Sequence, residues 1–345
     1  MTRERILLVQ TAFLGDVVLT TPLLGALRRH LPDATITMLV TPAARALVAH
    51  HPAVDRVLVD DKRGADRGLG GLARLARRLR AEHVTIAIAA QKSIRTALAL
   101  RAAGIPRRIG FATAPAARLY TDRVPRPLER HDRDRLLALL APLGIDQVDP
   151  AVLQPRIVVD AATEARAASL LAPHARSGRP LAALCPGSAW RTKRWPAAAF
   201  GALARALDAD GYRCLLFGGP DERALTASVA AAADGRAVDL GGTTDLPLLA
   251  AVMGRVAVAV TNDSAPMHLA TAAGIPQVAI FCATVPAQGY GPLGTRALVV
   301  ERDLACRPCG RHGGERCPRG TDDCMELVTV ADVRAAVARV HARAA

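Results

Sequence analysis

The sequence predicts an α/β protein of two similar Rossmann-like domains, each a parallel sheet covered by helices on both faces. Short continuous runs of apolar β-forming residues, such as the run at 5–10, are typical of buried parallel strands. Stretches with apolar residues at helical spacing alternate with these runs. The alternation starts afresh at Pro180, and 345 residues are long for one core and comfortable for two.

Two polar stretches, 146–160 and 173–180, are candidates for the linker between the domains. With the later one as the boundary, we expect a first domain over residues 1–175 and a second over residues 176–330. A final helix at 331–345 has an apolar stripe, and we expect it to pack back on the first domain.

Composition bounds the class of protein. Hydrophobic residues make up 51% of the chain and aromatic residues only 3%, which is a globular rather than a disordered composition. No apolar run is long enough to span a bilayer. The charged N-terminus runs directly into a strand-like segment, unlike a signal peptide, so we expect a cytoplasmic protein.

The net charge of +14 suggests an anionic partner, but the strong excess of arginine over lysine weakens that inference. Three of the 45 basic residues are lysine and 42 are arginine, which looks like a compositional habit of a whole proteome. No helix-turn-helix, zinc-finger repeat or aromatic-studded basic strand is evident, so we expect no nucleic acid partner. Peripheral attraction to an anionic membrane surface or an acidic glycolipid is consistent with the charge.

The loop after the first strand carries Gly15 and Asp16. Gly15 permits a tight turn, and Asp16 lies at or just inside a helix whose apolar residues recur at helical spacing from Val17. From the residues alone, Asp16 is either an ordinary helix-start acid favoured by the helix dipole or a functional carboxylate.

Two cationic segments, D-K-R-G and Q-K-S-I-R, also follow predicted strands. Because the carboxyl ends of parallel strands meet at one edge of a sheet, both segments open onto the same edge as Asp16. Taken singly, each cation is more often a solvated loop residue. The cations concerned are Lys62, Arg63, Lys92 and Arg95.

The second domain opens with a strand and the turn P-G-S-A-W-R-T-K-R-W-P. Gly187 lets the backbone approach a ligand, Ser188 can donate a hydrogen bond to phosphate, and Lys193 can supply a compact point charge. The glycine spacing and the Lys-Ser/Thr pair of a Walker loop are absent. In the next strand–helix pair, Glu222 lies near a helix start, and Thr244 lies in a loop before a later helix.

The stretch at 256–281 reads as a buried strand, a polar turn, a helix over about 265–273 and a second buried strand. Asp263 or Ser264 is a natural N-cap, and His268 lies one helical turn beyond Ser264. Backbone N–H groups without intrahelical partners and the positive end of the helix dipole both point at this turn, which therefore suits phosphate or another anion. Many such strand–helix units nevertheless bind nothing.

These segments resemble, in order and over nearly the whole chain, the glycosyltransferase family that contains the ADP-heptose:lipopolysaccharide heptosyltransferases. The segment T-N-D-S-A-P-M-H-L-A resembles its D-[ST]-[GA]-x-x-H turn, and G-S-A-W-R-T-K-R-W-P resembles its G-[ST]-x-x-x-x-K-x-W-P turn. The resemblance implies a GT-B fold, with two Rossmann-like domains facing across a cleft. It also implies an inverting transfer of heptose from ADP-heptose to an inner-core sugar of lipopolysaccharide, with no cofactor required for catalysis.

Site roles follow from the same resemblance. Asp16 matches the proposed general base that deprotonates the acceptor hydroxyl, and Lys62, Arg63, Lys92 and Arg95 become candidates for binding an acidic acceptor sugar. The donor-binding residues are expected to be Ser188, Lys193, Glu222 (toward the ribose), Thr244 (in the adenosine pocket), Asp263, Ser264, Ala265 and His268. Ala265 departs from the glycine commonest at its position, and its methyl group would crowd the phosphates slightly.

Four of the seven cysteines lie within nineteen residues, in a loop rich in Gly, Pro and Arg. They are Cys306, Cys309, Cys317 and Cys324. In a cytoplasmic protein this spacing indicates a metal site more than disulfides, and the alternatives are a structural zinc ion or reduced thiols. Cys185, Cys214 and Cys282 are expected in strands, as small core residues.

Three other readings compete with this assignment. One is a family member that uses another nucleotide sugar or acceptor. Another is a nicotinamide dehydrogenase, which the lack of G-x-G-x-x-G after any predicted strand disfavours. The third is a non-catalytic nucleotide- or nucleic-acid-binding protein with the cysteines as a zinc knuckle.

Overall fold

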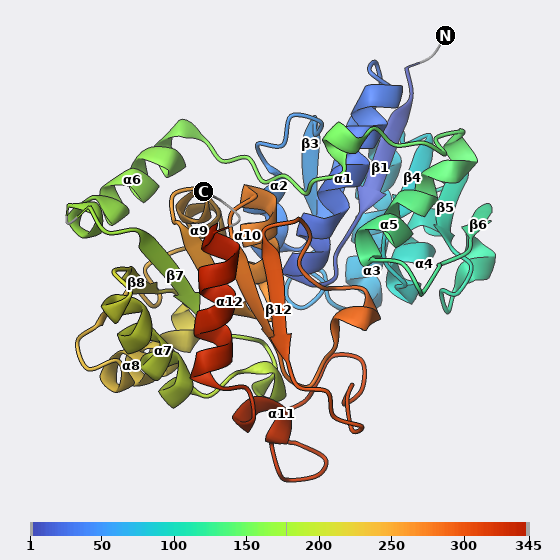
Figure 1. Cartoon of the computed structure of the whole chain (residues 1–345). Helices are drawn as coiled ribbons and strands as arrows, with labels where there is room; N and C mark the ends of the chain where they lie inside the picture. The colour runs from blue at the N-terminus through green and yellow to red at the C-terminus, as the bar shows by residue number, and fades with distance from the viewer. Residues whose placement is uncertain (1–2, 177, 343–345) are drawn as a thin grey trace. The chain divides into compact units, whose positions relative to one another are not determined.

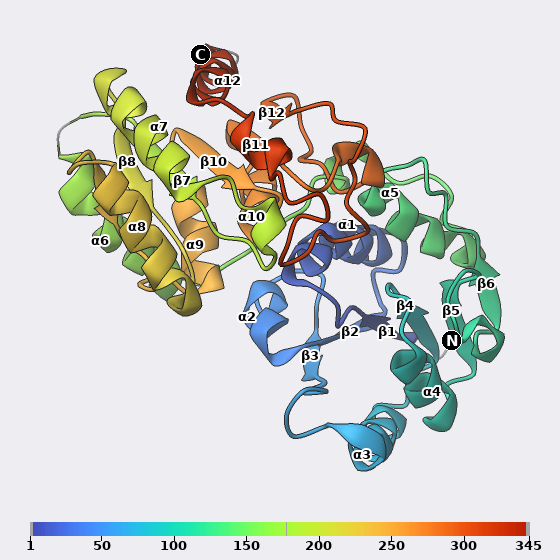
Figure 2. The same ribbon diagram turned by 90° about the horizontal axis from the view of Figure 1, so that it is seen from below.

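The computed structural model describes residues 3–176 and 178–342, and the chain divides into two compact units, Met1–Val158 and Val159–Ala345. Each unit contains one six-stranded parallel sheet with helices on both faces (Figures 1 and 2). This confirms the predicted fold class. Within the described residues, every helix is too short or too polar to cross a lipid bilayer.

The first unit has the strand order β3-β2-β1-β4-β5-β6, with every neighbouring pair parallel. Its strands are β1 Arg5–Val9, β2 Thr35–Val40, β3 Arg56–Val59, β4 Ile86–Ala89, β5 Arg107–Phe111 and β6 Asp122–Val124. Its α-helices are α1 Leu14–His30, α2 Arg45–Val48, α3 Gly68–Ala81, α4 Ile94–Ala102 and α5 Asp132–Leu137. Helices α3 and α4 pack together on one face, and α1 and α5 pack together on the other (Figure 2).

The second unit has the order β12-β11-β10-β7-β8-β9, again with parallel pairs throughout. Its strands are β7 Leu181–Cys185, β8 Arg213–Leu216, β9 Ala237–Asp239, β10 Val258–Asn262, β11 Gln277–Phe281 and β12 Ala297–Glu301. Its α-helices are α6 Ala161–Ala175, α7 Ala197–Ala209, α8 Arg223–Ala232, α9 Leu246–Met253, α10 Ala265–Ala273, α11 Asp323–Glu326 and α12 Val330–Ala342. Counted within the unit, this is the same 3-2-1-4-5-6 order as in the first unit.

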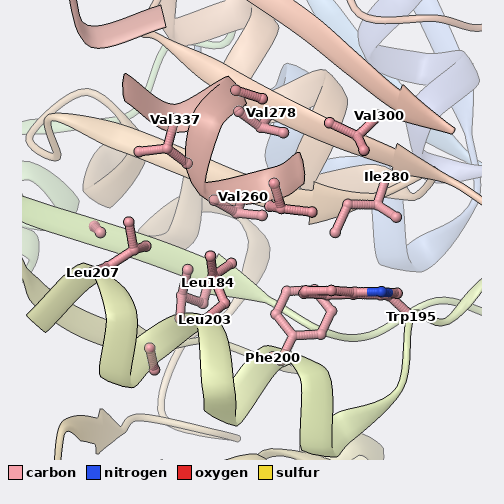
Figure 3. Packing of buried hydrophobic residues seen from close by; sticks show 14 of the residues in the cluster. Leu184, Trp195, Phe200, Leu203, Leu207, Val260, Val278, Ile280, Val300 and Val337 are labelled. Carbon is pink, nitrogen blue, oxygen red and sulfur yellow. The ribbon is translucent and has the colours of Figure 1, made fainter. Parts of the chain in front are cut away.

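The core of the second unit forms between its sheet and helices α7 and α12. Figure 3 shows Leu203 and Leu207 of α7 beneath Leu184 and Val260 of the sheet, with Val337 of α12 beside the strands. All five side chains are essentially inaccessible to solvent. Such continuous burial explains why these strands lack the polar alternation of a half-exposed sheet.

The boundary between the two compact units differs from the expected one, and the contacts described for the final helix lie within the second unit. The division falls at Val158 and Val159, inside the earlier of the two candidate linkers, because α6 packs on α9 and so belongs to the second unit. Helix α12 contacts α7 and strands β10 to β12 of the second unit, where its apolar stripe completes the core. Apolar spacing marks which face of a helix is buried but does not name the surface that covers it.

In both sheets the strand order reverses direction between the first and fourth strands, at β1/β4 and at β7/β10. Ligands of open α/β sheets bind outside the carboxyl ends of the strands at such a switch point. The loops that carry Asp16 and Lys92 follow β1 and β4, and those that carry Lys193 and Ser264 follow β7 and β10. The motifs found in the sequence therefore lie at the two switch points.

Candidate active site

Asp16 lies in the first turn of α1 and is half-buried. Its carboxylate Oδ2 accepts a hydrogen bond from the backbone N–H of Phe13, the residue that caps the helix, at 3.2 Å. Its carbonyl accepts from the Thr20 hydroxyl at 2.6 Å. The contact with Phe13 uses one lobe of the carboxylate and fixes its direction, but a carboxylate has further lone pairs with which to accept a proton.

A network of neutral side chains joins β1 and β4 at the first switch point. The Thr11 N–H donates to Gln91 Oε1 at 3.2 Å, and Gln91 Nε2 donates to the hydroxyls of Thr11 at 2.6 Å and Thr96 at 2.9 Å. Buried Gln10 bridges the Thr20 hydroxyl and the Ala90 carbonyl in the same way. Because these polar groups satisfy one another, hydrogen bonds between uncharged side chains join the loops after β1 and β4.

Lys62 reaches this network from the loop after β3. Its Nζ donates to the Thr11 carbonyl at 2.5 Å and to the Thr11 hydroxyl at 3.4 Å. Burial lowers the pKa of Lys62; the carboxylate of Asp60 opposes this, and the guanidiniums of Arg63 and Arg95 add to it. The ammonium keeps a third N–H for another acceptor. Lys62 therefore reaches the loop that precedes Asp16 at the same edge of the sheet, and its predicted contact with the acceptor stays a prediction.

Arg95 has internal partners. Its guanidinium forms a bidentate pair with Asp60, at 3.1 and 2.9 Å, and also donates to the carbonyls of Asp66 and Gly68. Asp60 is only 3% exposed, so the pair ties the start of α4 to the end of β3. Most of the donors of Arg95 are occupied, which suits a structural role more than the predicted contact with acceptor. The other two acceptor candidates, exposed Arg63 and half-buried Lys92, lie in the loops after β3 and β4.

A cavity of about 680 Å³ lies elsewhere in the first unit, between β6 and the loop after β5. None of the predicted site residues lines it. Its lining residues are Ala112, Ala114, Pro115, Ala117, Arg118 and Arg123.

At the second switch point, Lys193 and Asp263 form an ion pair. Lys193 Nζ lies 2.5 Å from Asp263 Oδ2, and the two side chains are 13% and 8% exposed. The Thr284 hydroxyl donates to the same carboxylate oxygen at 2.6 Å, from the loop after β11. Asp263 therefore holds the ammonium at the end of β10, and the ammonium keeps two further N–H donors for a ligand.

Residues 186–196 form a turn, hereafter the 186–196 turn. The Asn262 side chain binds both ends of this turn. Its Nδ2 donates to the Pro186 carbonyl at 2.7 Å, and its Oδ1 accepts from the Trp195 N–H at 3.1 Å. The Trp195 ring is 1% exposed, and its centroid lies 5.1 Å from that of Phe200 in an edge-on arrangement. Figure 3 shows the two rings against each other. Both anchors are buried, so the backbone on either side of Lys193 is fixed to the core.

Glu222 lies against the beginning of the same turn. A Cβ added at Gly187 would clash with the Glu222 carboxylate, which also accepts from the Gly219 N–H at 2.9 Å. Gly187 thus permits close approach of a side chain from the next loop, whereas the sequence predicted close approach of a ligand. Ser188 is buried, and its carbonyl accepts from Arg194 at 2.8 Å.

Helix α10 begins at Ala265, with Ser264 as N-cap residue. The Ser264 side chain does not cap the helix; its hydroxyl donates weakly to the Asn262 carbonyl at 3.4 Å. The first turn of α10 therefore receives no side-chain acceptor from its N-cap, which favours an anion there. His268 is buried on α10, and Thr244 is buried in the loop before α9.

The loop at residues 302–322, hereafter the cysteine loop, packs on the end of the second sheet. Buried Arg307 anchors it by donating to the carbonyls of Phe281 at 3.1 Å and Thr284 at 2.6 Å and by pairing with Glu301 at 2.7 Å. The Cys309 N–H donates to the Ala283 carbonyl at 2.8 Å. The loop is thereby held beside Thr284, the partner of Asp263.

The clustered thiols influence one another electrostatically. Burial raises the pKa of Cys324 to about 11, and the charges of Cys309, Cys317 and Cys306 add to that shift. The backbone N–H of Asp322, together with those of three neighbouring residues, holds the pKa of Cys317 below its usual value against a smaller effect of burial. All seven cysteines are free thiols. Cys185 and Cys214 are buried in β7 and β8 as predicted, whereas Cys282 is buried directly after β11 rather than in a strand.

The thiols are not arranged as a closed metal site. In the part of the chain that the structure describes, no three His, Cys, Asp or Glu side chains are grouped so as to hold a metal ion. Cys309 Sγ instead lies 3.4 Å from the Cys306 carbonyl. The donor set is chemically suited to zinc, but its arrangement is that of separate thiols.

Sequence reasoning missed Asn262 and Thr284, which fix the 186–196 turn and Asp263. Asn262 stands inside the T-N-D-S segment, directly before Asp263, so its place in the turn was a usable signal. Thr284 follows a buried strand without any distinguishing pattern, and only the packing of β11 beside β10 brings it to Asp263.

Comparison with known proteins identifies the family. The model of glycosyltransferase family 9 (heptosyltransferase) matches residues 72–316. Lipopolysaccharide heptosyltransferase 2 of Escherichia coli K12 is 26% identical over 309 residues, which cover 86% of this chain and 87% of that protein.

Solved structures agree in fold. A family 9 glycosyltransferase from Veillonella parvula DSM 2008 is 25% identical, with a TM-score of 0.88 and 99% of each chain covered. The E. coli ADP-heptose LPS heptosyltransferase II is 23% identical, with a TM-score of 0.81 and the same coverage. With the family model spanning most of its length and both sheets matching these structures, the chain belongs to glycosyltransferase family 9, the heptosyltransferases.

Proposed function

We propose that this protein is an inverting glycosyltransferase that moves heptose from ADP-heptose to an inner-core sugar of lipopolysaccharide. Family membership and the names of the E. coli relatives support the donor and the acceptor class. The observation that carries the proposal is the Lys193–Asp263 pair, held at the switch point of the second sheet beside the start of α10. A fixed ammonium next to uncapped backbone N–H groups suits a diphosphate.

In the proposed donor complex, the diphosphate takes hydrogen bonds from Lys193, Ser188 and the Ser264–Ala265 turn. Negative charge on the departing ADP grows in the transition state, and donors held in place beforehand stabilise it there without further reorganisation. Asp263 does not bind the anion; it orients Lys193 and offsets part of its charge. Glu222 takes the ribose hydroxyls, and Thr244 and His268 line the nucleotide side.

The acceptor half of the proposal rests on the first unit. Asp16 removes the proton from the attacking hydroxyl, which then displaces ADP from the anomeric carbon in one step with inversion. Lys62, Arg63 and Lys92 bind the acidic groups of the acceptor, and Arg95 keeps Asp60 and the neighbouring loops in place. The support is their position on the loops after β1, β3 and β4.

No step of this mechanism is assigned to a metal ion, since Lys193 and the start of α10 supply positive charge for the leaving group. A structural zinc at the four clustered cysteines is a separate question that metal analysis of the purified protein answers. A structural zinc would be established by one equivalent of zinc in the purified protein, together with protection of Cys306 and Cys309 from alkylation that disappears when the zinc is removed. Reactive thiols in metal-free protein of unchanged stability would establish the reduced state.

We place the protein in the cytoplasm, in peripheral contact with the inner membrane surface where a lipid-linked acceptor would be presented. The net charge of +14 supports attraction to such an anionic surface.

The test is incubation with ADP-heptose and deacylated core glycolipid. We expect release of ADP and one added heptose mass on the glycolipid, with an inverted anomeric configuration by NMR. Parallel reactions with other ADP-sugars distinguish a relative with a different donor. If ADP-heptose neither binds nor reacts while an oligonucleotide stabilises the protein, the assignment is overturned in favour of a nucleic-acid-binding protein.

A further inference from the structure

The cysteine loop lies directly on the turn that carries Lys193. Thr192 N–H and Thr192 Oγ1 both donate to the Gly314 carbonyl, at 3.0 and 2.9 Å, and the Gly314 N–H lies 2.8 Å from Thr192 Oγ1. A Cβ at Gly313 would lie 3.0 Å from Thr192 Oγ1 and 3.1 Å from Lys193 Cγ. The two segments are therefore hydrogen-bonded at Thr192, and any side chain larger than that of glycine at position 313 would crowd Lys193.

Further contacts fix the loop on both sides of this point. Arg191 donates to the Glu315 carbonyl at 2.7 Å and forms a bidentate pair with Asp322 at 3.1 and 3.0 Å. Gln288 donates to the carbonyls of Gly310 at 3.2 Å and Arg311 at 3.4 Å. Residues 314 and 315 are thus held against the 186–196 turn, and residues 310 and 311 are held by Gln288 of the loop after β11.

His312 stands in the middle of this segment, next to Gly313. Its side chain is partly buried. Burial lowers the pKa of His312 below 6.5; the positive charges of Arg311 and Lys193 add to that shift, and the carboxylate of Asp263 opposes it. Of these three charged groups, one comes from its own loop and two come from the ion pair at the switch point.

We propose that His312 is a further ligand of the donor's diphosphate, supplied by the cysteine loop to the site formed by Lys193 and the start of α10. This inference rests on the proposed function, because it takes the Lys193 site as the diphosphate site. The imidazole of His312 is carried by the residue next to Gly313 and is close enough to Lys193 for its charge to act on the ring, so an N–H of the ring can donate to a phosphate oxygen bound there. A bound anion strengthens that bond by favouring the protonated ring.

A proton balance follows from this arrangement. In the free protein, burial and the two cations keep His312 neutral near pH 7. A bound diphosphate adds negative charge and raises the pKa of His312, so the complex takes up a proton. Affinity for the donor is then lowest above the pKa of His312 in the complex and increases as the pH falls below that value. It becomes constant once the pH lies below the pKa of His312 in the free protein.

Calorimetry with ADP-heptose in the absence of acceptor tests the proposal. The diphosphate diester has no group that titrates near neutral pH, so proton uptake, measured in buffers of different ionisation enthalpy, reports on the protein. We expect uptake of up to one proton in the wild-type protein. His312→Gln should abolish most of it and weaken binding about tenfold or more, as for loss of a charge-assisted hydrogen bond. His312→Arg should retain affinity while losing the pH dependence.

His174→Gln is the matched control. Burial also lowers the pKa of His174, with a smaller contribution from Arg213, which begins β8 at the opposite end of the same sheet. This variant should leave both affinity and proton uptake unchanged. If wild-type protein binds ADP-heptose but His312→Gln matches it in affinity and proton uptake, His312 is not a ligand. If wild-type protein does not bind ADP-heptose at all, the proposed function itself fails.

Discussion

The two units share one sheet order but differ in the chemistry of their switch points. At β1/β4, buried Gln10 and the Thr11–Gln91 pair satisfy one another without formal charge, and Asp16 lies beside them on α1. At β7/β10, a nearly buried ion pair of Lys193 and Asp263 occupies the corresponding place. The same strand order therefore frames a network of amide and hydroxyl groups beside one carboxylate in one unit and a nearly buried ion pair in the other.

The ion pairs of the two units differ in a second way. Arg95 and Asp60 use bidentate geometry, and the arginine's remaining donors go to backbone carbonyls, so that pair is closed. Lys193 makes a single contact with Asp263, and its ammonium retains donors. A guanidinium suits permanent bracing of two loops, whereas a compact ammonium suits a charge that must also reach a ligand.

The largest expected effect comes from Asp16→Asn, which keeps the shape of the side chain and removes its capacity to accept a proton. We expect kcat to fall about 10²–10⁴-fold, the usual contribution of a positioned general base. The dissociation constant of ADP-heptose should not change, because the carboxylate belongs to the acceptor half. Steady-state rates and calorimetry measure the two quantities, and turnover equal to that of wild-type protein would remove Asp16 from the reaction.

Lys193→Ala is expected to change both donor affinity and stability. Donor binding should weaken at least about tenfold from loss of a charge-assisted hydrogen bond. The free energy of unfolding should fall by about 3–5 kcal/mol, because Asp263, 8% exposed, is left as an uncompensated buried charge.

A second substitution separates these two effects. Adding Asp263→Asn to Lys193→Ala should restore much of the stability, since the unpaired charge is gone, but none of the donor affinity. Chemical denaturation and calorimetry on both variants give the answer. Recovery of donor binding in the double variant would show that Lys193 acts only as a structural partner of Asp263.

Arg95→Met gives the smallest expected functional effect. It tests whether Arg95, unlike Lys193, serves only the structure. Asp60 loses its bidentate partner, so the free energy of unfolding should fall by about 3 kcal/mol. The dissociation constant of ADP-heptose should match that of wild-type protein, and the Michaelis constant for acceptor should change less than in Lys62→Ala. A larger increase in Arg95→Met than in Lys62→Ala would return Arg95 to the acceptor site.

Local pattern predicted the two parallel sheets because helices cover both faces of each sheet, and a strand that is buried on both faces is apolar along its length. The turn before α10 was predictable for a similar reason: a polar Asn-Asp-Ser segment, Pro266 in the first helical turn and Gly274 at its end are all local signals. The helix at Ala265–Ala273 has the bounds that the sequence predicted.

Contacts between distant segments were beyond such patterns. Nothing near Arg95 in the chain indicates that Asp60 consumes its donors, and nothing in α12 indicates which unit its apolar face covers. From the sequence, Gly187 was expected to leave space for a ligand, but in the folded chain the Glu222 carboxylate occupies that space.

The sequence by itself determined the α/β class, the repeat of one layout in two halves and the positions of the loops that follow each strand. Only the tertiary structure decided which charges in those loops are closed by partners and which keep donors or lone pairs for a ligand. The physical reason is that periodicity and turn chemistry act over a few neighbouring residues. The free energy of a buried charge instead depends on whatever side chain the folded sheet brings beside it.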